Sequence, residues 1–387
     1  MMLIHSITLT NFLSFGPQAE TVEMRPLNII IGPNGAGKSN FIEAVDLLRS
    51  APDQFLRPIR EGGGIQDWLW KGAEETPEAS INAVFGYSRK PNLRYVLSFT
   101  SAGQRFEITD EQIENETAFE GNPRPYFYYH FNAGQPYLNI KDERRSLQRE
   151  SVDFEKSILS QRRDPDHYPE ITWLANTLGA IRLYREWSFG RDTPPRMAQK
   201  TDMPNDFLEC RCGNLGLVLN SLRHAPDVKR RILEALRILS GSYEDFDVRI
   251  EGGTVQVFLQ EGRFMIPATR LSDGTLRYLC LLAILCHPKP PPLVCIEEPE
   301  LGLHPDILPA IADLLKEASE RCQLIVTTHS DILVDAMTGD PESVLVCEKD
   351  EGGTVLRRLN AQQLRPWLEK YRLGQLWTSG EIGGTRW

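Results

Sequence analysis

"PLNIIIGPNGAGKSNFIEAVDLLRS" (residues 26–50) contains three kinds of sequence in direct succession. A short apolar run ends at Gly32, which predicts a buried β-strand, and a glycine-rich turn follows it. Apolar side chains then recur at positions 41, 42, 44, 45, 47 and 48, the spacing of one face of an α-helix. The stretch therefore predicts a strand, a glycine loop and a helix, which indicates an α/β fold.

The glycine loop, "GPNGAGKSN" (residues 32–40, called the phosphate loop below), matches the pattern G-x-x-x-x-G-K-[ST] between a strand and a helix. Its glycines let backbone N–H groups turn inward around phosphate oxygens, and the helix start adds its positive dipole end. We expect Lys38 to neutralise the outer phosphates and the Ser39 hydroxyl to bind Mg²⁺. The alternative is a glycine turn without a ligand. The residues expected to contact the nucleotide are Asn34, Gly35, Ala36, Gly37, Lys38, Ser39 and Asn40.

Two carboxylates follow a second apolar run, in "PLVCIEEPELGLHP" (residues 292–305). Open parallel sheets bind their ligands at the carboxyl ends of the strands, and neighbouring residues of a strand point to opposite sides. We expect Glu297 to face the metal and its waters, and Glu298 to orient or deprotonate the attacking water. A surface turn is the alternative. "LIVTTHS" (residues 324–330) is a third such strand, and it places His329 at the same sheet edge, either as a γ-phosphate sensor or as a packed core histidine.

"LSDGT" (residues 271–275) forms a polar turn directly before a long apolar helix. The Ser272 hydroxyl, the Gly274 N–H and the helix start would bind a second anion. The phosphate loop already has its own glycines, lysine and helix start. We therefore expect LSDGT to approach the γ-phosphate of a second subunit in a symmetric dimer. An ordinary capped helix is the alternative.

The remaining sequence predicts how the chain is divided. Strands are expected at 3–11, 20–24, 245–250 and 254–259, an antiparallel sheet within 79–140, and helices within 143–185 and 214–240. We expect an N-terminal lobe (1–142), a helical subdomain (143–240), a C-terminal lobe (241–350) and a tail (351–387). The net charge of −10 argues against a mainly electrostatic nucleic-acid binder, although Lys229-Arg230-Arg231 could contact phosphates.

Composition favours a cytoplasmic protein without a membrane segment. No apolar run approaches the roughly 18 residues that a membrane helix needs, and the N-terminus has no secretory pattern. Cysteines are odd in number, seven, and mostly lie in apolar stretches, which indicates a reducing compartment. Cys210-x-Cys212 lacks the further ligands of a zinc site.

Together, "NFLSF" (residues 11–15), the phosphate loop, "LSDGT", "EEPELGLHP" and "TTHS" resemble the ABC-type ATPase heads of the branch that contains SMC proteins, RecF and OLD-family ATPases. The chain looks most similar to the short, arm-less AAA-type 21 (AAA_21) ATPases, whose tails also resemble "YRLGQLWTSGEIGG". The resemblance implies a P-loop NTPase with a mixed central sheet, an antiparallel β subdomain and a helical subdomain. It also implies ATP and Mg²⁺ as cofactors.

The resemblance assigns roles to individual residues. Lys38 and Ser39 would bind phosphate and Mg²⁺, and Glu297 would bind the metal. Glu298 would be the general base and His329 the switch histidine, while Ser272 and Gly274 would act in trans. A glutamine between the β and helical subdomains normally senses Mg²⁺; Gln161 is the first candidate as that metal contact and Gln66 the second.

Three positions depart from the family pattern. Glu297 stands where most ABC ATPases have Asp, which implies a longer or water-mediated metal contact. Leu13 stands where many SMC-like heads have a basic residue, and His304 where transporter ATPases have a dimer-communicating aspartate.

The resemblance predicts an ATPase that dimerises head to head around ATP and Mg²⁺ and controls a partner. OLD-family proteins carry a TOPRIM nuclease domain, but only about 37 residues follow "VLVCEKD". We expect any nuclease to be a separate chain of a DNA-directed or phage-defence system. The alternatives are a RecF-like, ATP-gated DNA clamp and, less in keeping with "NFLSF" and "EEPE", the ATPase subunit of a transporter.

Overall fold

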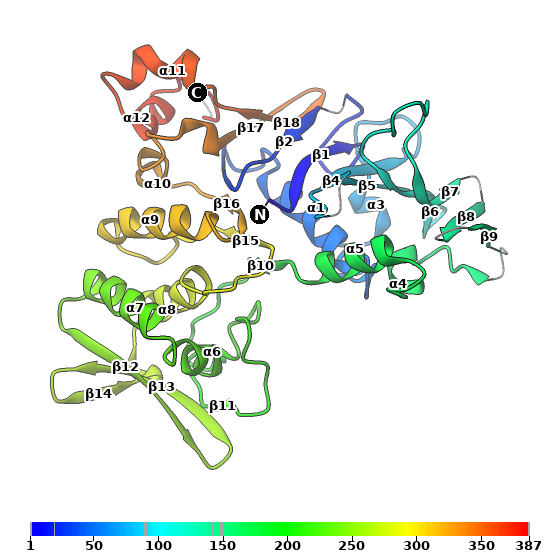
Figure 1. Ribbon diagram of the computed structural model, residues 1–387. Helices are drawn as coiled ribbons and strands as arrows, with labels where there is room; N and C mark the ends of the chain where they lie inside the picture. The colour runs from blue at the N-terminus through cyan, green and yellow to red at the C-terminus, as the bar shows by residue number, and fades with distance from the viewer. Residues whose placement is uncertain are drawn as a thin grey trace.

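The computed structural model describes residues 2–18, 20–88, 91–132, 134–140, 143–147 and 151–385. Its backbone forms three lobes around a central sheet (Figure 1). An antiparallel β lobe lies on the right in Figure 1, a helical lobe with a small sheet lies at the lower left, and the C-terminal helices lie at the upper left. Within these ranges, no helix is both long and apolar enough to cross a membrane.

The central sheet has six strands, and five of them are parallel. Their order is β10 (Arg182–Tyr184), β15 (Leu293–Glu297), β16 (Gln323–Thr327), β3 (Leu27–Ile31), β17 (Val344–Asp350) and β18 (Gly353–Arg358). β18 pairs antiparallel with β17, so the sheet is mixed, as expected. The apolar runs expected to be buried strands before Gly32, Glu297 and His329 are β3, β15 and β16, and their parallel pairing is confirmed. β17 also pairs parallel with β3.

Helices cover both faces of this sheet, which explains why β3 and β16 are buried along their whole length and β15 up to its last residue. Because successive side chains of a strand alternate between faces, Ile29 packs in one core cluster and Ile30 in the other. The cluster around Ile29 includes α8 (Asp273–Leu285) and α9 (Leu308–Ser319). The cluster around Ile30 includes α1 (Lys38–Ser50) and α5 (Pro169–Gly179). The predicted helix after the phosphate loop coincides with α1.

An eight-stranded antiparallel sheet forms the β lobe and packs on the far side of α1. Its order is β2 (Thr21–Glu23), β1 (Ile4–Thr10), β4 (Ala79–Phe85), β5 (Leu93–Ala102), β6 (Arg105–Asn115), β7 (Phe127–Asn132), β8 (Gln135–Ile140) and β9 (Glu143–Ser146). The predicted antiparallel sheet is confirmed. Two short helices, α2 (Arg57–Glu61) and α3 (Ile65–Trp68), precede β4.

The helical prediction for 143–185 is wrong in two places. β9 continues the antiparallel sheet, and β10 is the edge strand of the central sheet. Only α4 (Ile158–Gln161) and α5 are helices in this range. β10 has three residues, too few for a period-two pattern to be visible in the sequence.

The helical lobe contains α6 (Leu215–Leu222), α7 (Pro226–Leu239) and α8, which pack on a small antiparallel sheet. In that sheet β13 (Thr254–Glu261) pairs with β12 (Tyr243–Glu251) on one edge, and with β11 (Gln199–Lys200) and β14 (Phe264–Pro267) on the other. The predicted strands at 245–250 and 254–259 correspond to β12 and β13. The division of the chain at 142, 240 and 350 stays a prediction.

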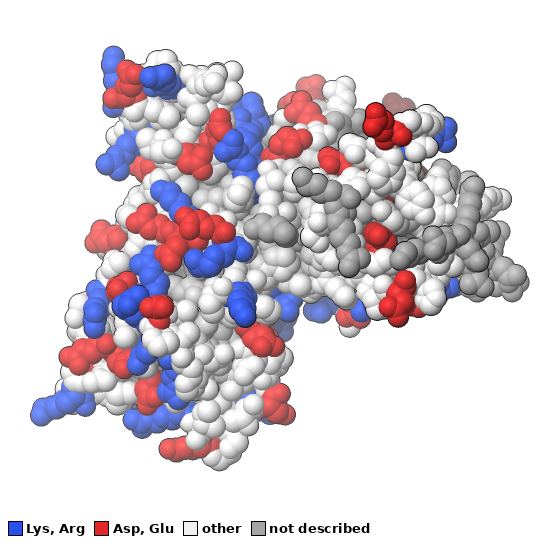
Figure 2. Space-filling view, in the orientation of Figure 1, with Lys and Arg blue, Asp and Glu red and all other residues white. Residues whose placement is uncertain are grey.

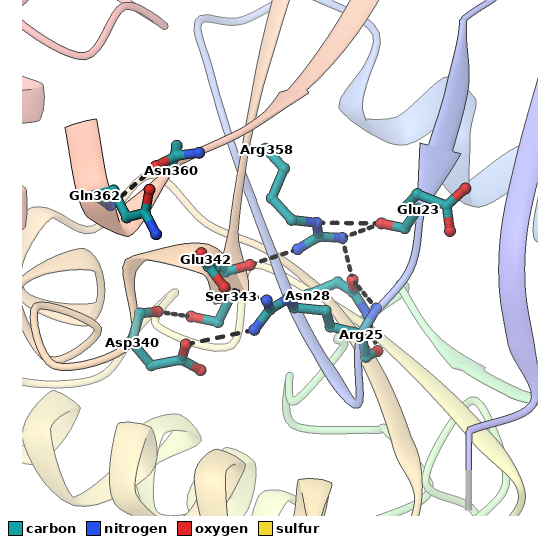
Figure 3. A network of polar contacts seen from close by, with 9 residues as sticks. All are labelled: Glu23, Arg25, Asn28, Asp340, Glu342, Ser343, Arg358, Asn360 and Gln362. Atoms are coloured by element: carbon teal, nitrogen blue, oxygen red, sulfur yellow. Dashed lines mark hydrogen bonds and ion pairs between the residues drawn. The ribbon is translucent and has the colours of Figure 1, made fainter. Parts of the chain in front are cut away.

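The C-terminal segment is folded onto the central sheet. After β18 it forms α11 (Ala361–Leu368) and α12 (Leu373–Thr378), and α12 packs on α10 (Asp331–Asp335). Arg358 at the end of β18 donates to the Glu23 and Glu342 carbonyls and to Asn28 Oδ1 (Figure 3). These bonds join the end of β18 to the last residue of β2, to the start of β3 and to the turn before β17. This end of the sheet lies opposite the phosphate loop.

Candidate nucleotide and metal site

The phosphate loop connects β3 to α1 in a conformation that requires glycine. Gly35 and Gly37 have φ angles of 80° and 113°, a region that other residues rarely adopt. A Cβ atom on Gly37 would also collide with the side chains of Thr354 and Ser14. No side chain caps the first turn of α1. The N–H groups of that turn are therefore available to an anion.

Lys38 is buried, and its Nζ donates to the carbonyls of Gly32 at 2.7 Å and Pro33 at 3.1 Å. Burial lowers the pKa of Lys38, and nearby acids including Glu298 and Glu297 oppose that shift. The ammonium group thus lies over the loop that would hold phosphates. Phosphate oxygens would replace these two carbonyls as stronger, charged acceptors.

The loop is braced from behind by two segments far apart in the sequence. Thr354 of β18 donates to the Ala36 carbonyl and lies 2.7 Å from the Ser14 hydroxyl. The Asn40 amide also donates to Ser14, at 2.7 Å. Asn34, Gly35 and Ser39 are exposed, and Ala36 and Gly37 are buried. These contacts explain the position of "NFLSF" beside the phosphate loop, with Leu13 at a φ of 49°.

Glu297 ends β15 and connects the phosphate loop to the sheet edge. Its Oε2 atom accepts from Ser39 Oγ at 3.3 Å, and its Oε1 atom forms an ion pair with Arg185 Nε at 2.7 Å. Arg185 directly follows β10, and its Nη2 donates to Glu43 Oε1 of α1 at 2.7 Å. Arg185 therefore bridges two carboxylates beside Ser39.

Burial and charge act in opposite directions on this group. Burial raises the pKa of Glu297 above its ordinary value, although Arg185 and Ser39 oppose the shift. Burial alone would lower the pKa of Arg185, but Glu43 and Glu297 raise it above its ordinary value. Arg185 thus carries a permanent positive charge that compensates the two acids.

Ser39 and Glu297 suit Mg²⁺ because both offer oxygen ligands and Glu297 is largely desolvated. The described residues contain no group of three or more His, Cys, Asp or Glu side chains that could hold a metal. A metal here would need phosphate oxygens and water to complete its shell, which is how Mg²⁺ usually binds with nucleotides. In such a complex Ser39 and Glu297 would be its protein ligands.

Glu298 and His329 lie together at the ends of β15 and β16. His329 Nε2 is 3.6 Å from Glu298 Oε1. Glu298 has a φ of 47°, which is uncommon for a residue with a side chain, and its N–H donates to the Thr327 carbonyl. Glu300 accepts from the His329 N–H and the Thr328 hydroxyl, both at 2.7 Å. Glu300 thereby ties the histidine to the acidic turn.

Trp187 contacts the backbone of the acidic turn, residues 297–300. Its Nε1 donates to the Glu297 carbonyl at 2.9 Å. The Arg277 guanidinium lies 5.2 Å from the Trp187 ring centre and donates to the Glu298 carbonyl at 3.3 Å. Burial lowers the pKa of Arg277. α8 is thus joined to the same turn as the two acids.

LSDGT lies beside the acidic turn of its own chain. Ser272 caps α8 by accepting from the Thr275 N–H, and a Cβ on Gly274 would lie 2.7 Å from the Gly302 carbonyl. No hydrogen bond or ion pair among the described residues joins Ser272 or Gly274 to the phosphate loop. Their action in trans stays a prediction.

The two glutamine candidates have other partners. The Gln161 amide bonds with the backbone of Asp153 and Lys156 on the far side of α4. The Gln66 amide bonds with Ser101 and Gly103 at the surface. The structure brings neither side chain to Ser39 or Glu297. The connection from the β lobe to the helical lobe instead runs through β10. Arg185, directly after β10, is the residue of this connection that contacts Glu297.

Sequence reasoning missed Arg185, Glu43, Glu300, Trp187 and Arg196. Glu300 had a visible signal, because it is part of the EEPE motif. Glu43 lies on α1, four residues after Ser39, so helical spacing could have placed it on the same face. Arg185 and Trp187 had none, since they follow a strand that was not predicted. Arg196, from the loop before β11, contacts Leu271 and Asp273 of LSDGT.

Known proteins share this architecture. A stretch of 126 residues, 31% of the chain, is 26% identical to structural maintenance of chromosomes protein 1 of Arabidopsis thaliana and spans 10% of that protein. The Smc head from Pyrococcus furiosus, bound to the C-terminal domain of ScpA, aligns with a TM-score of 0.60 at 14% identity, over 96% of this chain and 99% of that one. An Smc head bound to the C-winged helix domain of ScpA gives 0.59 at 15%, over 93% and 99%.

These alignments establish the fold as that of an SMC-like P-loop ATPase head. Residues 27–335, from the start of β3 to the end of α10, match the model of the AAA_21 family, which is described as "AAA domain, putative AbiEii toxin, Type IV TA system". That match covers most of the chain and includes the phosphate loop, both acids and His329. The chain therefore belongs to the AAA_21 family, and its fold is that of an SMC-like ATPase head.

Proposed function

We propose that this protein hydrolyses ATP in a Mg²⁺-dependent reaction and uses the cycle to control a partner. The observation that carries the proposal is that Glu298 and His329, 3.6 Å apart, both lie close enough to interact with the charge of Lys38 in the uncapped first turn of α1. An anion held at that turn would present its outer phosphate to a carboxylate base.

Each side chain has a defined task in this reaction. Lys38 would exchange its two carbonyl acceptors for phosphate oxygens. Ser39 and Glu297 would hold Mg²⁺, which when bound supplies neutralisation of the phosphate charge. Glu298 would accept the proton of the attacking water, and His329 would hold that water and the γ-phosphate in line.

We propose that two copies pair head to head, with Ser272 and Gly274 of one copy completing the site of the other. The support is physical: α8 has 13 residues and begins at Asp273, directly after its N-cap Ser272, and a helix N-terminus of this kind can bind an anion. In a C2 dimer, LSDGT of each copy would face the phosphate loop of the other copy, which forms two equivalent sites. ATP would then bind as the shared ligand between the heads.

We propose a separate protein as the controlled partner, either a TOPRIM-like nuclease or another effector of a defence or toxin–antitoxin system. Two Smc heads with the same fold are described as bound to domains of ScpA. The family description names a toxin system. Both support a head that acts on another chain.

A DNA clamp has less support. Lys229, Arg230 and Arg231 of α7 are paired with Asp245, Asp227 and Glu317, at 2.7–2.8 Å. Figure 2 shows acidic and basic side chains interspersed over this face. Since paired cations release few counterions from DNA, this cluster would add little affinity.

Glu298→Gln and Lys38→Ala test the proposal together. With ATP and Mg²⁺, Glu298→Gln should bind nucleotide, lose at least about 100-fold in turnover and accumulate as a dimer in light scattering. Lys38→Ala should bind neither nucleotide nor a second copy. Normal turnover by Glu298→Gln would refute the assignment of the base. A Glu298→Gln protein that binds ATP but stays monomeric would refute the dimer.

A further inference from the structure

Arg185 is a permanent cation placed where the metal is expected. It follows β10 and reaches across to Glu297 at the end of the neighbouring strand β15 and to Glu43 on α1. Both contacts are 2.7 Å, and the three side chains are 17–26% exposed. Glu43 and Glu297 therefore share one guanidinium in a partly desolvated position.

This contact also sets the direction of Glu297. One carboxylate oxygen faces Arg185, and the other faces the Ser39 hydroxyl. Arg185 donates a hydrogen bond to Glu43 and forms an ion pair with Glu297, so its planar guanidinium holds the two carboxylates near each other. Only Oε2 of Glu297 is then free to join Ser39 in binding a cation.

Removing the guanidinium would leave two neighbouring carboxylates with a hydroxyl beside them. Such a set of oxygens attracts divalent cations, and the uncompensated charge strengthens the attraction. The guanidinium thus opposes metal binding by the protein alone. A nucleotide adds negative phosphate oxygens on the Ser39 side and restores the attraction.

We propose that Arg185 is a positioning residue and the built-in counter-cation of the metal site: it directs one oxygen of Glu297 toward Ser39 and makes Mg²⁺ binding depend on nucleotide. This proposal rests on the proposed Mg²⁺–ATP function. It also accounts for glutamate at position 297. An aspartate is shorter by one C–C bond, about 1.5 Å, and could not keep both its Arg185 and its Ser39 contacts.

Mn²⁺ binding measured by electron paramagnetic resonance tests the proposal without turnover. The wild type should bind Mn²⁺ weakly without nucleotide and tightly with ATP. Arg185→Met should bind Mn²⁺ roughly tenfold more tightly without nucleotide, because two acids lose their counter-charge. Adding Glu43→Gln to Arg185→Met should reverse that gain. A merely structural arginine would not produce a gain of metal affinity on its removal.

Arg231→Met is the matched control. Arg231 pairs with Glu317 at 2.7 Å between α7 and α9, away from the phosphate loop, and is 34% exposed. Its loss should leave Mn²⁺ binding unchanged. Arg185→Lys keeps the charge but not the planar fork, and should retain weak Mn²⁺ binding without nucleotide.

The outcomes separate the two proposals. Unchanged Mn²⁺ affinity in a folded Arg185→Met protein that still binds ATP would overturn the role of Arg185 and leave the ATPase proposal standing. An equal loss of ATP affinity with and without Mg²⁺ would also overturn it, because it would place Arg185 on the phosphates. A wild type that binds no ATP would instead refute the proposed function.

Discussion

The Nε2 atom of His329 lies 3.6 Å from the Oε1 atom of Glu298, and both side chains are about one-third exposed. Burial and the nearby Lys38 ammonium lower the pKa of His329, and the acids Glu298 and Glu300 only partly offset this. His329 is therefore neutral at neutral pH. A neutral imidazole leaves the Glu298 carboxylate free to accept a proton from water.

We expect turnover to be independent of pH just above 6.5, the ordinary pKa of histidine, and to fall only below that value. The direction follows from the lowered pKa, since His329 becomes charged only below its ordinary value. Charged His329 would pair with Glu298 and weaken it as a base. The pH profile of kcat for the wild type and His329→Asn checks this: the variant should be slower and lose the acid limb. An unchanged limb would assign it to another group.

The φ of 47° at Glu298 predicts a conflict between stability and activity. Asparagine adopts this region more readily than glutamate or glutamine does. Glu298→Asn should therefore be more stable than Glu298→Gln by about 0.5–1 kcal/mol, and both should be inactive. Urea unfolding of the two variants compares their free energies of unfolding. Neither variant has the carboxylate charge, so the difference reports the backbone conformation. Equal stability would show that the surrounding turn relaxes with either side chain.

Much of this site could be predicted because parallel strands bring their carboxyl ends to one edge. β3, β15 and β16 were visible as apolar runs, so the phosphate loop, Glu298 and His329 were expected to meet there. α1 could be predicted because its six apolar positions share one helix face. Periodicity is informative where an element is long or fully buried.

Arg185 could not be predicted for the opposite reason. β10 is short and follows α5 closely, so the sequence does not predict the strand that pairs with β15 at the edge of the sheet. The family resemblance implied a glutamine at this position instead, but the Gln161 amide bonds with the backbone of its own loop. The role of Glu43 could not be predicted either, because Glu43 contacts the site through Arg185.

Arg196 holds the LSDGT turn from within its own chain. Its guanidinium is 7% exposed, donates to the Leu271 carbonyl at 2.5 Å and to the Phe189 carbonyl at 3.1 Å, and pairs with Asp273 at 2.5 Å. Asp273 is 70% exposed, so water screens most of that pair. The bonds to buried carbonyls should therefore dominate.

We expect Arg196→Met to reduce the free energy of unfolding by about 3 kcal/mol and Asp273→Asn by less than about 1 kcal/mol. Chemical denaturation of both variants measures the difference. The result would contradict this ranking of contacts if the two variants lost the same amount. Arg196→Met should also fail to dimerise with ATP while the monomer still binds it, since the turn loses its support.

Glu111 predicts an inverse dependence of stability on pH in the β lobe. It is fully buried, accepts from the Tyr95 and Ser157 hydroxyls and the Ile158 N–H, and burial raises its pKa from 4.5 to about 7. Because the folded state binds the proton more tightly, this stabilising contribution is complete below pH 4.5 and is lost as pH rises through 7.

We expect this group to remove about 3 kcal/mol of stability between pH 4.5 and pH 8. Glu111→Gln cannot ionise and should lack that part of the slope. Unfolding free energies of both proteins at several pH values give the difference. Parallel curves would mean that Glu111 keeps its ordinary pKa.

The C-terminal tail connects the phosphate loop to the helix that follows His329. Gly384 has a φ of 70°, and a Cβ there would lie 2.9 Å from Val346 Cγ1 and 3.5 Å from the Cα of Gly32, the first residue of the phosphate loop. In α12 of the same tail, the N–H of Gly374 donates to Asp335 of α10 at 2.7 Å. A shift of the tail would therefore reach both ends of the site.

Gly384→Ala should weaken ATP binding roughly threefold to tenfold, because the added methyl group displaces the tail or Gly32. Gly103→Ala is the control: Gly103 has a φ of 69°, the same backbone strain, but a Cβ there meets nothing within 4 Å. Gly103→Ala should lose about 1 kcal/mol of stability and Gly384→Ala at least as much, and only Gly384→Ala should lose ATP affinity. Titration calorimetry with ATP separates them. Equal ATP affinities would mean that the tail packs on the phosphate loop without influencing it.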